Sequence, residues 1–219
     1  MAKTRSYNLL CPIARALDAV GDRWSLLILR DLHAGPARFA DLQSGLTGIA
    51  SNLLSDRLVH LAAEGFLEKG PGPHGTTLYQ LTDVGWSTRQ LLFELARLGG
   101  QLMPVAKPKK PGNLRTIAVT LAAALERAGA GDTPLTATLE VEGEAFAIET
   151  GNGTVSVTAG AALGNDLRLV SSYDALLQVS VGAISLHAFS ERFASLSGGT
   201  ENSQSALMQA LAGAMAQIQ

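Results

Sequence analysis

The sequence is poor in cysteine and lacks any long uninterrupted apolar run. Cys11 is the single cysteine among 219 residues, which excludes an internal disulfide framework and favours a reducing cytoplasm. No stretch reaches the roughly 18 apolar residues that a membrane-spanning helix needs, and no apolar run follows the charged N-terminus as in a secretory signal. We therefore expect a cytoplasmic protein without a membrane partner.

Patterns typical of catalysis or metal binding are also lacking. The four histidines are scattered without metal-ligand spacing, at His33, His60, His74 and His187. The sequence has no second cysteine, no glycine-rich phosphate loop and no nucleophile elbow. It therefore predicts a protein that is not an enzyme, with no catalytic residues, no bound metal and no cofactor.

Lysine is absent after residue 112, and this absence divides the chain by charge. Residues 1–112 hold 13 Lys and Arg against 9 Asp and Glu, whereas residues 113–219 hold 4 against 10. The boundary segment 103–112 carries three prolines, three lysines and a glycine, and no helix or strand period survives in it. A basic half joined to an acidic half indicates two domains with different partners, although small domains also differ in charge by chance.

The first half has helical periodicity followed by a hairpin pattern. Residues 11–32 predict one helix that buries a stripe of apolar residues, namely Ile13, Leu17, Val20, Trp24, Leu27 and Ile28. Residues 38–43 predict a short helix, and residues 49–64 predict a longer amphipathic one after a glycine-containing turn. Two strand-like runs, 66–69 and 77–82, then flank a loop rich in glycine and proline, and a helix follows over 83–102. Helix, helix-turn-helix, hairpin and helix, in this order, are typical of a winged helix.

Six spaced motifs in one order resemble the HxlR-type winged-helix regulators. They are Cys11-Pro12, the run from Gly21 to Leu32, the run from Gly35 to Leu42, the run from Gly48 to Leu58, the run from Leu61 to Leu67, and the run from Tyr79 to Gly85. The resemblance covers roughly residues 7 to 103. It implies a homodimeric bacterial transcription regulator, most often a repressor, that binds double-stranded DNA at an operator with inverted half-sites.

The residue types at the start of the second helix of the pair suit DNA recognition. Short polar side chains there can reach base edges and phosphates, and the candidates for DNA contacts, with Arg38 and the wing residues added, are Arg38, Ser51, Asn52, Ser55, Arg57, Lys69 and His74. Arg57 could instead pair with Asp56 or Asp41 on the protein surface. The family often has Ser-Pro-Lys before this helix, and this chain lacks that positive charge, so a modest affinity or an unusual site is expected.

Two further expectations come with the resemblance. The family pairs its subunits through the N-terminal helix and the helix over 83–102, whose leucine stripe comprises Leu91, Leu92, Leu95, Leu98 and Leu102. In some members a cysteine near the position of Cys11 senses oxidants or electrophiles. A thiol at a helix N-terminus can be acidified by backbone dipoles, but cysteine is often only a small buried apolar residue.

The second half alternates as a small sheet flanked by helices. A helical stripe over 114–125 precedes four strands, at 136–142, 144–149, 153–158 and 166–170, and their one-faced alternation predicts an antiparallel sheet with one wet side. Helices are expected after Ser172, from His187, and over 203–217, with a short last strand at 193–197. The predicted fold class is therefore α+β, with a winged helix-turn-helix over 1–103, a linker over 104–112, and the sheet domain over 113–219.

This order resembles the sterol carrier protein type-2-like fold over about residues 113 to 219. The resemblance implies an apolar tunnel for a hydrophobic small molecule, lined by Phe146, Tyr173, Leu177, Phe189, Leu207, Leu211 and Met215. Those residues could equally form a filled core or a second dimer surface, because a fold does not establish a function. The alternative function is a hydrophobic-ligand-binding or partner-docking module in which the winged helix does not bind DNA.

Overall fold

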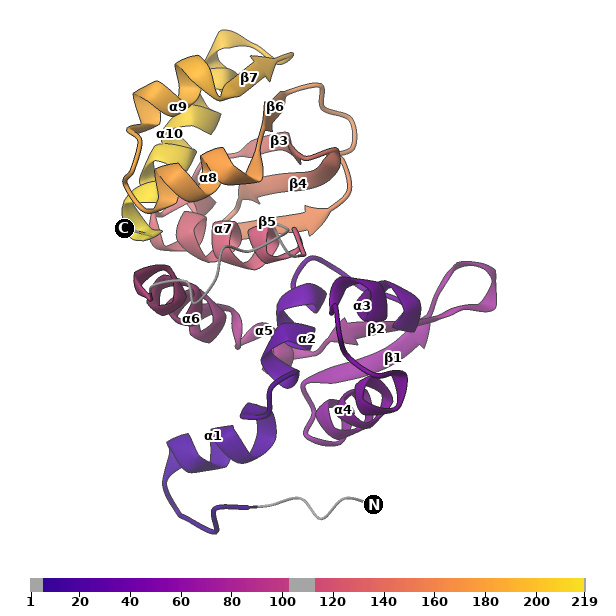
Figure 1. Ribbon diagram of the computed structural model, residues 1–219. Coiled ribbons are helices and arrows are strands. Elements are labelled where there is room, and N and C mark those ends of the chain that lie inside the picture. Colours follow the sequence, from indigo (N-terminus) through magenta and orange to yellow (C-terminus); the bar gives the residue numbers. More distant parts are fainter. Residues whose placement is uncertain (1–5, 103–112, 219) are drawn as a thin grey trace. The chain divides into compact units, whose positions relative to one another are not determined.

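The α+β fold class is confirmed, and the chain forms two compact units (Figure 1). The computed structural model describes residues 6–102 and 113–218, and the units comprise residues 1–88 and 89–219. The predicted linker 104–112 lies outside the described residues. Within the described ranges, no helix is long and apolar enough to cross a membrane.

The first unit has the predicted winged-helix order. Its elements are α1 (Pro12–Val20), α2 (Ser25–Leu32), α3 (Phe39–Gly45), α4 (Ser51–Ala63), β1 (Leu67–Pro71), the 3-10 turn η1 (Pro73–Gly75), β2 (Thr77–Leu81) and α5 (Asp83–Trp86). Strands β1 and β2 pair antiparallel, with Leu67 opposite Leu81. Ala37, just before α3, bridges to Tyr79 and attaches the start of the helix-turn-helix to the hairpin.

The prediction of one helix over 11–32 is wrong, because the helix is broken between Val20 and Ser25. At Gly21 a Cβ atom would lie 2.4 Å from the Leu17 carbonyl oxygen, so the tight end of α1 requires glycine. The Asp22 carboxylate then accepts hydrogen bonds from the backbone N–H groups of Trp24 (2.8 Å) and Ser25 (3.2 Å). These N–H groups lie at the start of α2, where they have no acceptor within the helix.

The predicted helix over 83–102 is also interrupted, at Ser87 and Thr88, and α6 begins at Arg89 (Arg89–Gln101). The Thr88 hydroxyl donates to the Gly85 carbonyl at 2.6 Å and hydrogen-bonds the buried His33 ring at 3.0 Å. These bonds tie the end of α5 to the end of α2. Gly85 is required there, since a Cβ atom on it would lie 2.1 Å from the Phe66 carbonyl oxygen.

The second unit begins with α6 and contains a five-stranded sheet with helices. Its further elements are α7 (Thr116–Arg127), the 3-10 turn η2 (Ala130–Asp132), β3 (Leu135–Val141), β4 (Glu144–Gly151), β5 (Thr154–Ala159), β6 (Arg168–Ser171), α8 (Tyr173–Ser180), α9 (Leu186–Arg192), β7 (Ala194–Ser197) and α10 (Glu201–Ile218). The strand order is β5-β4-β3-β6-β7. Helices α8 and α9 begin at serine caps, because Ser172 and Ser185 accept from the backbone N–H three residues on.

The expectation of a wholly antiparallel sheet is corrected at one pair, because β6 runs parallel to β3. The chain after β5 does not form a hairpin with β5. It crosses to the far side of β3, where β6 pairs with β3 in the parallel direction. Ala162 in this connection donates its backbone N–H to the buried Thr138 hydroxyl at 3.0 Å. The sheet is thus antiparallel except between β3 and β6.

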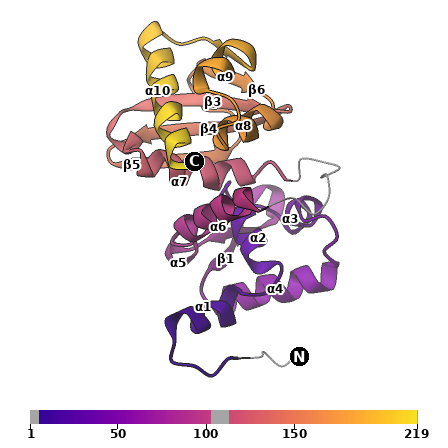
Figure 2. The same ribbon diagram turned by 60° about the vertical axis from the view of Figure 1, so that its left-hand side comes forward.

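One face of the sheet carries the apolar core. The residues that pair across β3, β4 and β6 on this face, Leu139, Phe146 and Leu169, are at most 1% exposed. Helices α7 and α10 pack together and contact this sheet (Figure 2). The opposite face presents alternating polar residues such as Thr136 and Glu140, which remain partly exposed.

Helix α6 packs against α7 through polar pairs, which is why it falls in the second unit. Arg89 contacts Glu126 at 2.7 Å, and Arg127 contacts Glu94 at 2.7 Å. The Arg127 guanidinium also lies 4.4 Å from the centre of the buried Phe93 ring. The compact units therefore divide at Thr88 and Arg89, before the proline- and lysine-rich segment at which the sequence predicted the division.

Replacing Gly85 with alanine is expected to lower the free energy of unfolding of the first unit by about 1–3 kcal/mol, because the added methyl group overlaps the Phe66 carbonyl. Both tryptophans, Trp24 and Trp86, belong to this unit, so urea unfolding followed by tryptophan fluorescence reports its stability. Gly70→Ala on β1 is the matched control in the same unit, since a Cβ atom there meets only the Gln80 side chain, at 3.7 Å or more. A Gly85→Ala protein as stable as the parent would contradict the close packing described here.

Candidate functional site

The rotation of α4 about its axis is fixed by three leucines on one side. Leu54, Leu58 and Leu61 are at most 1% exposed and recur at steps of four and three, so this face lies in the core. The opposite side near the helix start is exposed, and it presents Ser51, Asn52, Ser55 and Asp56. Four side chains with hydrogen-bonding groups thus face away from the protein on two successive turns.

The turn between α3 and α4 positions the start of this exposed face. Gly48 has φ of 95°, a left-handed conformation that favours glycine, and Ile49 beside it is buried. The Gln43 side-chain amide of α3 donates to the Ser51 hydroxyl of α4. Ser51, a predicted DNA contact, is therefore also part of the contact between the two helices.

Arg57 pairs with Asp22, which is not one of the partners predicted from the sequence. Its Nε atom lies 3.5 Å from the Asp22 Oδ1 atom, and both side chains are about one-third exposed or less. The pairing with Asp56 or Asp41 that was kept open does not occur. Asp22 thus contacts α4 as well as the start of α2, and Arg57 faces the α1–α2 junction.

Arg38 lies exposed at the N-cap position of α3, in a two-pronged pair with Asp41. Its Nε and Nη2 atoms donate to the two carboxylate oxygens at 3.0 and 3.1 Å. Hydrogen bonding to Asp41, and then the charge of that carboxylate, raise the pKa of Arg38 further above its ordinary value. The guanidinium stays charged at any physiological pH, but the neighbouring carboxylate neutralises much of its field.

The wing carries one lysine on its first strand and a histidine at its tip. The Lys69 ammonium lies 5.6 Å from the centre of the Tyr79 ring, which faces it across the hairpin. His74 is exposed and has φ of 55°, so the tip turns sharply within η1. Both residues are accessible to a ligand that approaches the hairpin.

Two helices present apolar side chains to solvent. On α1, Ile13 and Leu17 are 71% and 46% exposed, so the prediction that they are buried is wrong. On α6 the large exposed apolar residues are Leu91, Leu95 and Leu98, and Leu102 just after the helix is also exposed, whereas Leu92 is buried. Exposed apolar stripes of this kind are typical of surfaces that bind another chain. Cys11 is exposed at the N-cap position of α1.

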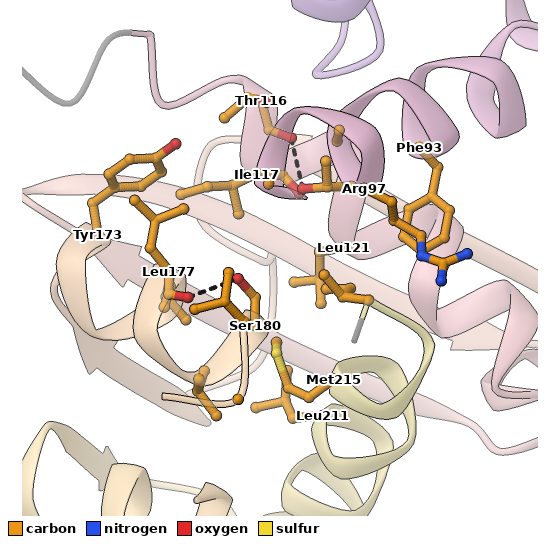
Figure 3. Close-up of a pocket in the computed structure, with 18 of the residues that line it drawn as sticks. Phe93, Arg97, Thr116, Ile117, Leu121, Tyr173, Leu177, Ser180, Leu211 and Met215 are labelled. Carbon is orange, nitrogen blue, oxygen red and sulfur yellow. Dashed lines mark hydrogen bonds between the residues drawn. The ribbon is translucent and has the colours of Figure 1, made fainter. Parts of the chain in front are cut away.

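A cavity of about 600 Å³ lies in the second unit, between α6, α7, α8, α9, α10 and the apolar sheet face (Figure 3). Five of the seven predicted lining residues border it, namely Tyr173, Leu177, Phe189, Leu211 and Met215. Phe146 and Leu207 do not border it and are buried in the core. Residues of α6, including Phe93 and Arg97, also line the cavity. They were not predicted, because helical periodicity does not reveal which neighbour a helix packs against.

The geometry defines a winged-helix protein in which one face of α4, the second helix of the helix-turn-helix, is exposed. Residues 19–107 match the family model of the HxlR-like helix-turn-helix. An HTH-type transcriptional regulator of Synechocystis is 30% identical over 92 residues, which are 41% of this chain and 68% of that protein. YvaP, a regulator of the same type from Bacillus subtilis, is 31% identical over 91 residues, or 40% of this chain and 84% of YvaP. A Mycobacterium bovis regulator is 35% identical over 101 residues, 45% of this chain and 62% of its own length.

Solved structures of similar chains align with less than half of this chain. PA1607, described as a transcription factor, is 36% identical, with a TM-score of 0.43 over 47% of this chain and 72% of its own. The reduced form of YodB from Bacillus subtilis is 25% identical, with a TM-score of 0.39 over 45% of this chain and 100% of its own.

The chain belongs to the HxlR-like helix-turn-helix family. It is a DNA-binding transcription regulator of the winged-helix type, as its sequence resemblance predicted. The family consists of regulators, which are normally not enzymes.

Removing the Asp22 side chain is expected to destabilise the first unit. Asp22→Ala deletes the acceptor for two backbone N–H groups of α2 and should lower the free energy of unfolding by about 1 kcal/mol. Asp22→Asn keeps an acceptor oxygen and should cost much less, as measured by urea unfolding and tryptophan fluorescence. Asp56→Ala, at an exposed position of α4, serves as the control and should change stability by no more than about 0.5 kcal/mol. Equal stability of Asp22→Ala and the parent would contradict this role.

Proposed function

We propose that this protein is a bacterial repressor that binds an inverted-repeat operator as a homodimer and is controlled by a hydrophobic small molecule in its second unit. The observation that carries the proposal is the exposed polar face at the start of α4, within a winged helix of the HxlR-like family. In helix-turn-helix proteins the second helix enters the major groove and its N-terminal residues contact base edges.

On the exposed face of α4, Asn52 and Ser55 are the residues that would recognise the base sequence. An asparagine can bond adenine through two hydrogen bonds, and a serine can contact either base edges or phosphates. Ser51 supports the helix start, because it accepts from Gln43. Arg57 is the weakest candidate, since its guanidinium would have to leave Asp22 to reach DNA.

Arg38 and the wing would contact the phosphate backbone of the DNA. Arg38 is exposed, and a DNA phosphate could replace Asp41 as its partner. Lys69 and His74 would contact the DNA backbone or the adjacent minor groove. The exposed side of α4 itself carries Asp56 and no exposed lysine or arginine, so phosphate neutralisation depends on these flanking cations, and a modest, salt-sensitive affinity is expected.

The homodimer is supported by the apolar stripes of α1 and α6. Leu91, Leu95 and Leu98 form one face of α6 at helical spacing, and Leu102 follows the last residue of the helix. A second copy of the same helix is a self-complementary partner for this face. Ile13 and Leu17 form a separate exposed apolar pair on α1 of the first unit. Pairing of two subunits would set two copies of α4 against successive half-sites.

The direct experiment is selection of fragments of the source genome by the purified protein, followed by mobility-shift binding at two salt concentrations with unrelated DNA as competitor. The proposal expects one enriched inverted repeat and a shift that weakens with salt. Absence of any enriched sequence would contradict it and favour a winged helix that serves only as a scaffold.

Asn52→Ala is expected to weaken binding to the selected operator about tenfold, since one good bidentate base contact contributes roughly 1–3 kcal/mol. Affinity for unrelated DNA should not change. Asn202→Ala, on the exposed first turn of α10, is the matched control. If Asn52→Ala lowered affinity for both DNAs equally, Asn52 would not read sequence.

Lys69→Met is expected to weaken binding to operator and unrelated DNA alike. Loss of one phosphate contact should also lower the slope of log affinity against log salt by about 1. Arg192→Met removes an exposed charge from α9 in the second unit and should leave both quantities unchanged. An unaltered salt dependence in Lys69→Met would exclude the wing from the DNA contact.

A further inference from the structure

Arg57 lies on α4 between the buried face of the helix and the exposed one. It directly follows Asp56 of the exposed face, and its side chain is 30% exposed. A helix in the major groove has a phosphate backbone along each flank, so an arginine at this position could contact a phosphate. In the structure the Arg57 Nε atom lies instead 3.5 Å from the Asp22 Oδ1 atom.

The Asp22 carboxylate is oriented by the start of α2. Its Oδ1 atom accepts from the backbone N–H groups of Trp24 and Ser25, at 2.8 and 3.2 Å, and its Oδ2 atom accepts from the Ser25 hydroxyl. These three donors are neutral. They fix the position of the carboxylate but do not balance its charge, and Arg57 supplies the compensating positive charge.

The environment of the pair favours Asp22 over a DNA phosphate as the partner of Arg57. The Asp22 side chain is only 25% exposed, and departure of Arg57 would leave this partly desolvated carboxylate without its cation, which is costly. A contact between an arginine and a phosphate at the surface is hydrated and screened by salt, so it contributes less. Arg57 is therefore expected to stay with Asp22 when the protein meets DNA.

The ion pair is not what attaches α4 to the α1–α2 junction. The Arg57 Nε atom is buried and has no hydrogen-bond partner among the described residues. A ring nitrogen of His60, on the next turn of α4, is hydrogen-bonded to the Ala19 carbonyl of α1 at 3.0 Å, and the two helices lie side by side there (Figure 2). Removal of the charge at Asp22 should consequently leave the helices packed together.

We propose that Asp22 is a positioning residue that holds Arg57 away from the DNA. The charge that α4 presents to the phosphate backbone is then determined by a carboxylate at the junction of two other helices. The proposal rests on the placement of α4 in the major groove that is proposed above. It implies that the protein binds all DNA with a lower affinity and a smaller salt dependence than it would with Arg57 free.

The test is fluorescence anisotropy of two labelled duplexes, the selected operator and a short unrelated sequence, titrated with the full chain at several salt concentrations. Asp22→Asn keeps the shape of the side chain and an acceptor oxygen for α2 but removes the charge. It should bind both duplexes about fivefold more tightly at low salt, and the slope of log affinity against log salt should steepen by about 1, as for one added phosphate contact. Partial unfolding would not raise affinity. An unchanged affinity and slope would overturn the proposal.

A double-mutant cycle assigns the gain to Arg57. Arg57→Met should abolish the gain in the Asp22→Asn protein, so removal of Arg57 should weaken binding at least about threefold more in that protein than in the parent. Glu64→Gln is the matched control, because it removes an exposed negative charge at the C-cap of the same helix and should not steepen the salt dependence. A gain that persists in the double variant, or an equal gain in Glu64→Gln, would make net charge responsible and would overturn the role of Asp22.

Nuclear magnetic resonance of the arginine Nε–H groups observes the side chain directly. The Arg57 signal is assigned by its loss in Arg57→Met, and added duplex should shift it much more in Asp22→Asn than in the parent. Equal shifts would overturn the proposal. If Asn52→Ala weakens operator binding as expected while Asp22→Asn changes nothing, only the role of Asp22 is wrong. If neither variant alters binding, the placement of α4 in the major groove is wrong as well.

Discussion

Burial of Leu54, Leu58 and Leu61 is the constraint on which the exposed polar face of α4, the proposed DNA contact, depends. Because these three side chains are almost completely inaccessible, α4 cannot rotate about its axis without exposing part of the core, at about 1.5–3 kcal/mol for each large apolar side chain. The exposed positions of the helix are therefore determined by its apolar ones. Asn52 and Ser55 face outward as a consequence of packing, before any DNA is present.

Polar contacts refine this arrangement. Asp22 accepts a hydrogen bond from the backbone at the start of α2 and lies beside Arg57 of α4, so one carboxylate connects the α1–α2 junction to α4. Arg38 is likewise neutralised by Asp41. The first unit consequently presents few unpaired cations near α4, and its selectivity for DNA sequence is expected to depend more on base contacts than on charge.

The winged-helix order and most strand positions follow from the sequence, because period and turn residues are local signals. In the sequence, Gly21 indicates only a residue of low helix propensity. The helix breaks there because Gly21 approaches the Leu17 carbonyl and because Asp22 accepts hydrogen bonds from the start of α2, and both contacts are visible only in the structure. The parallel β6 and the assignment of α6 to the second unit were not predictable for the same reason. Periodicity identifies the buried face of an element but not its neighbour, so Arg97 could not be recognised as a cavity residue.

The account is tested most directly by dimethyl sulfate footprinting on the selected operator. This reagent methylates guanine N7 in the major groove, which is where α4 is proposed to lie. The account predicts two clusters of protected guanines about 10 base pairs apart, one turn of DNA. In Asn52→Ala, the guanines next to the base that Asn52 contacts should lose this protection. Binding without any protection of guanine N7 would contradict recognition of the major groove by α4.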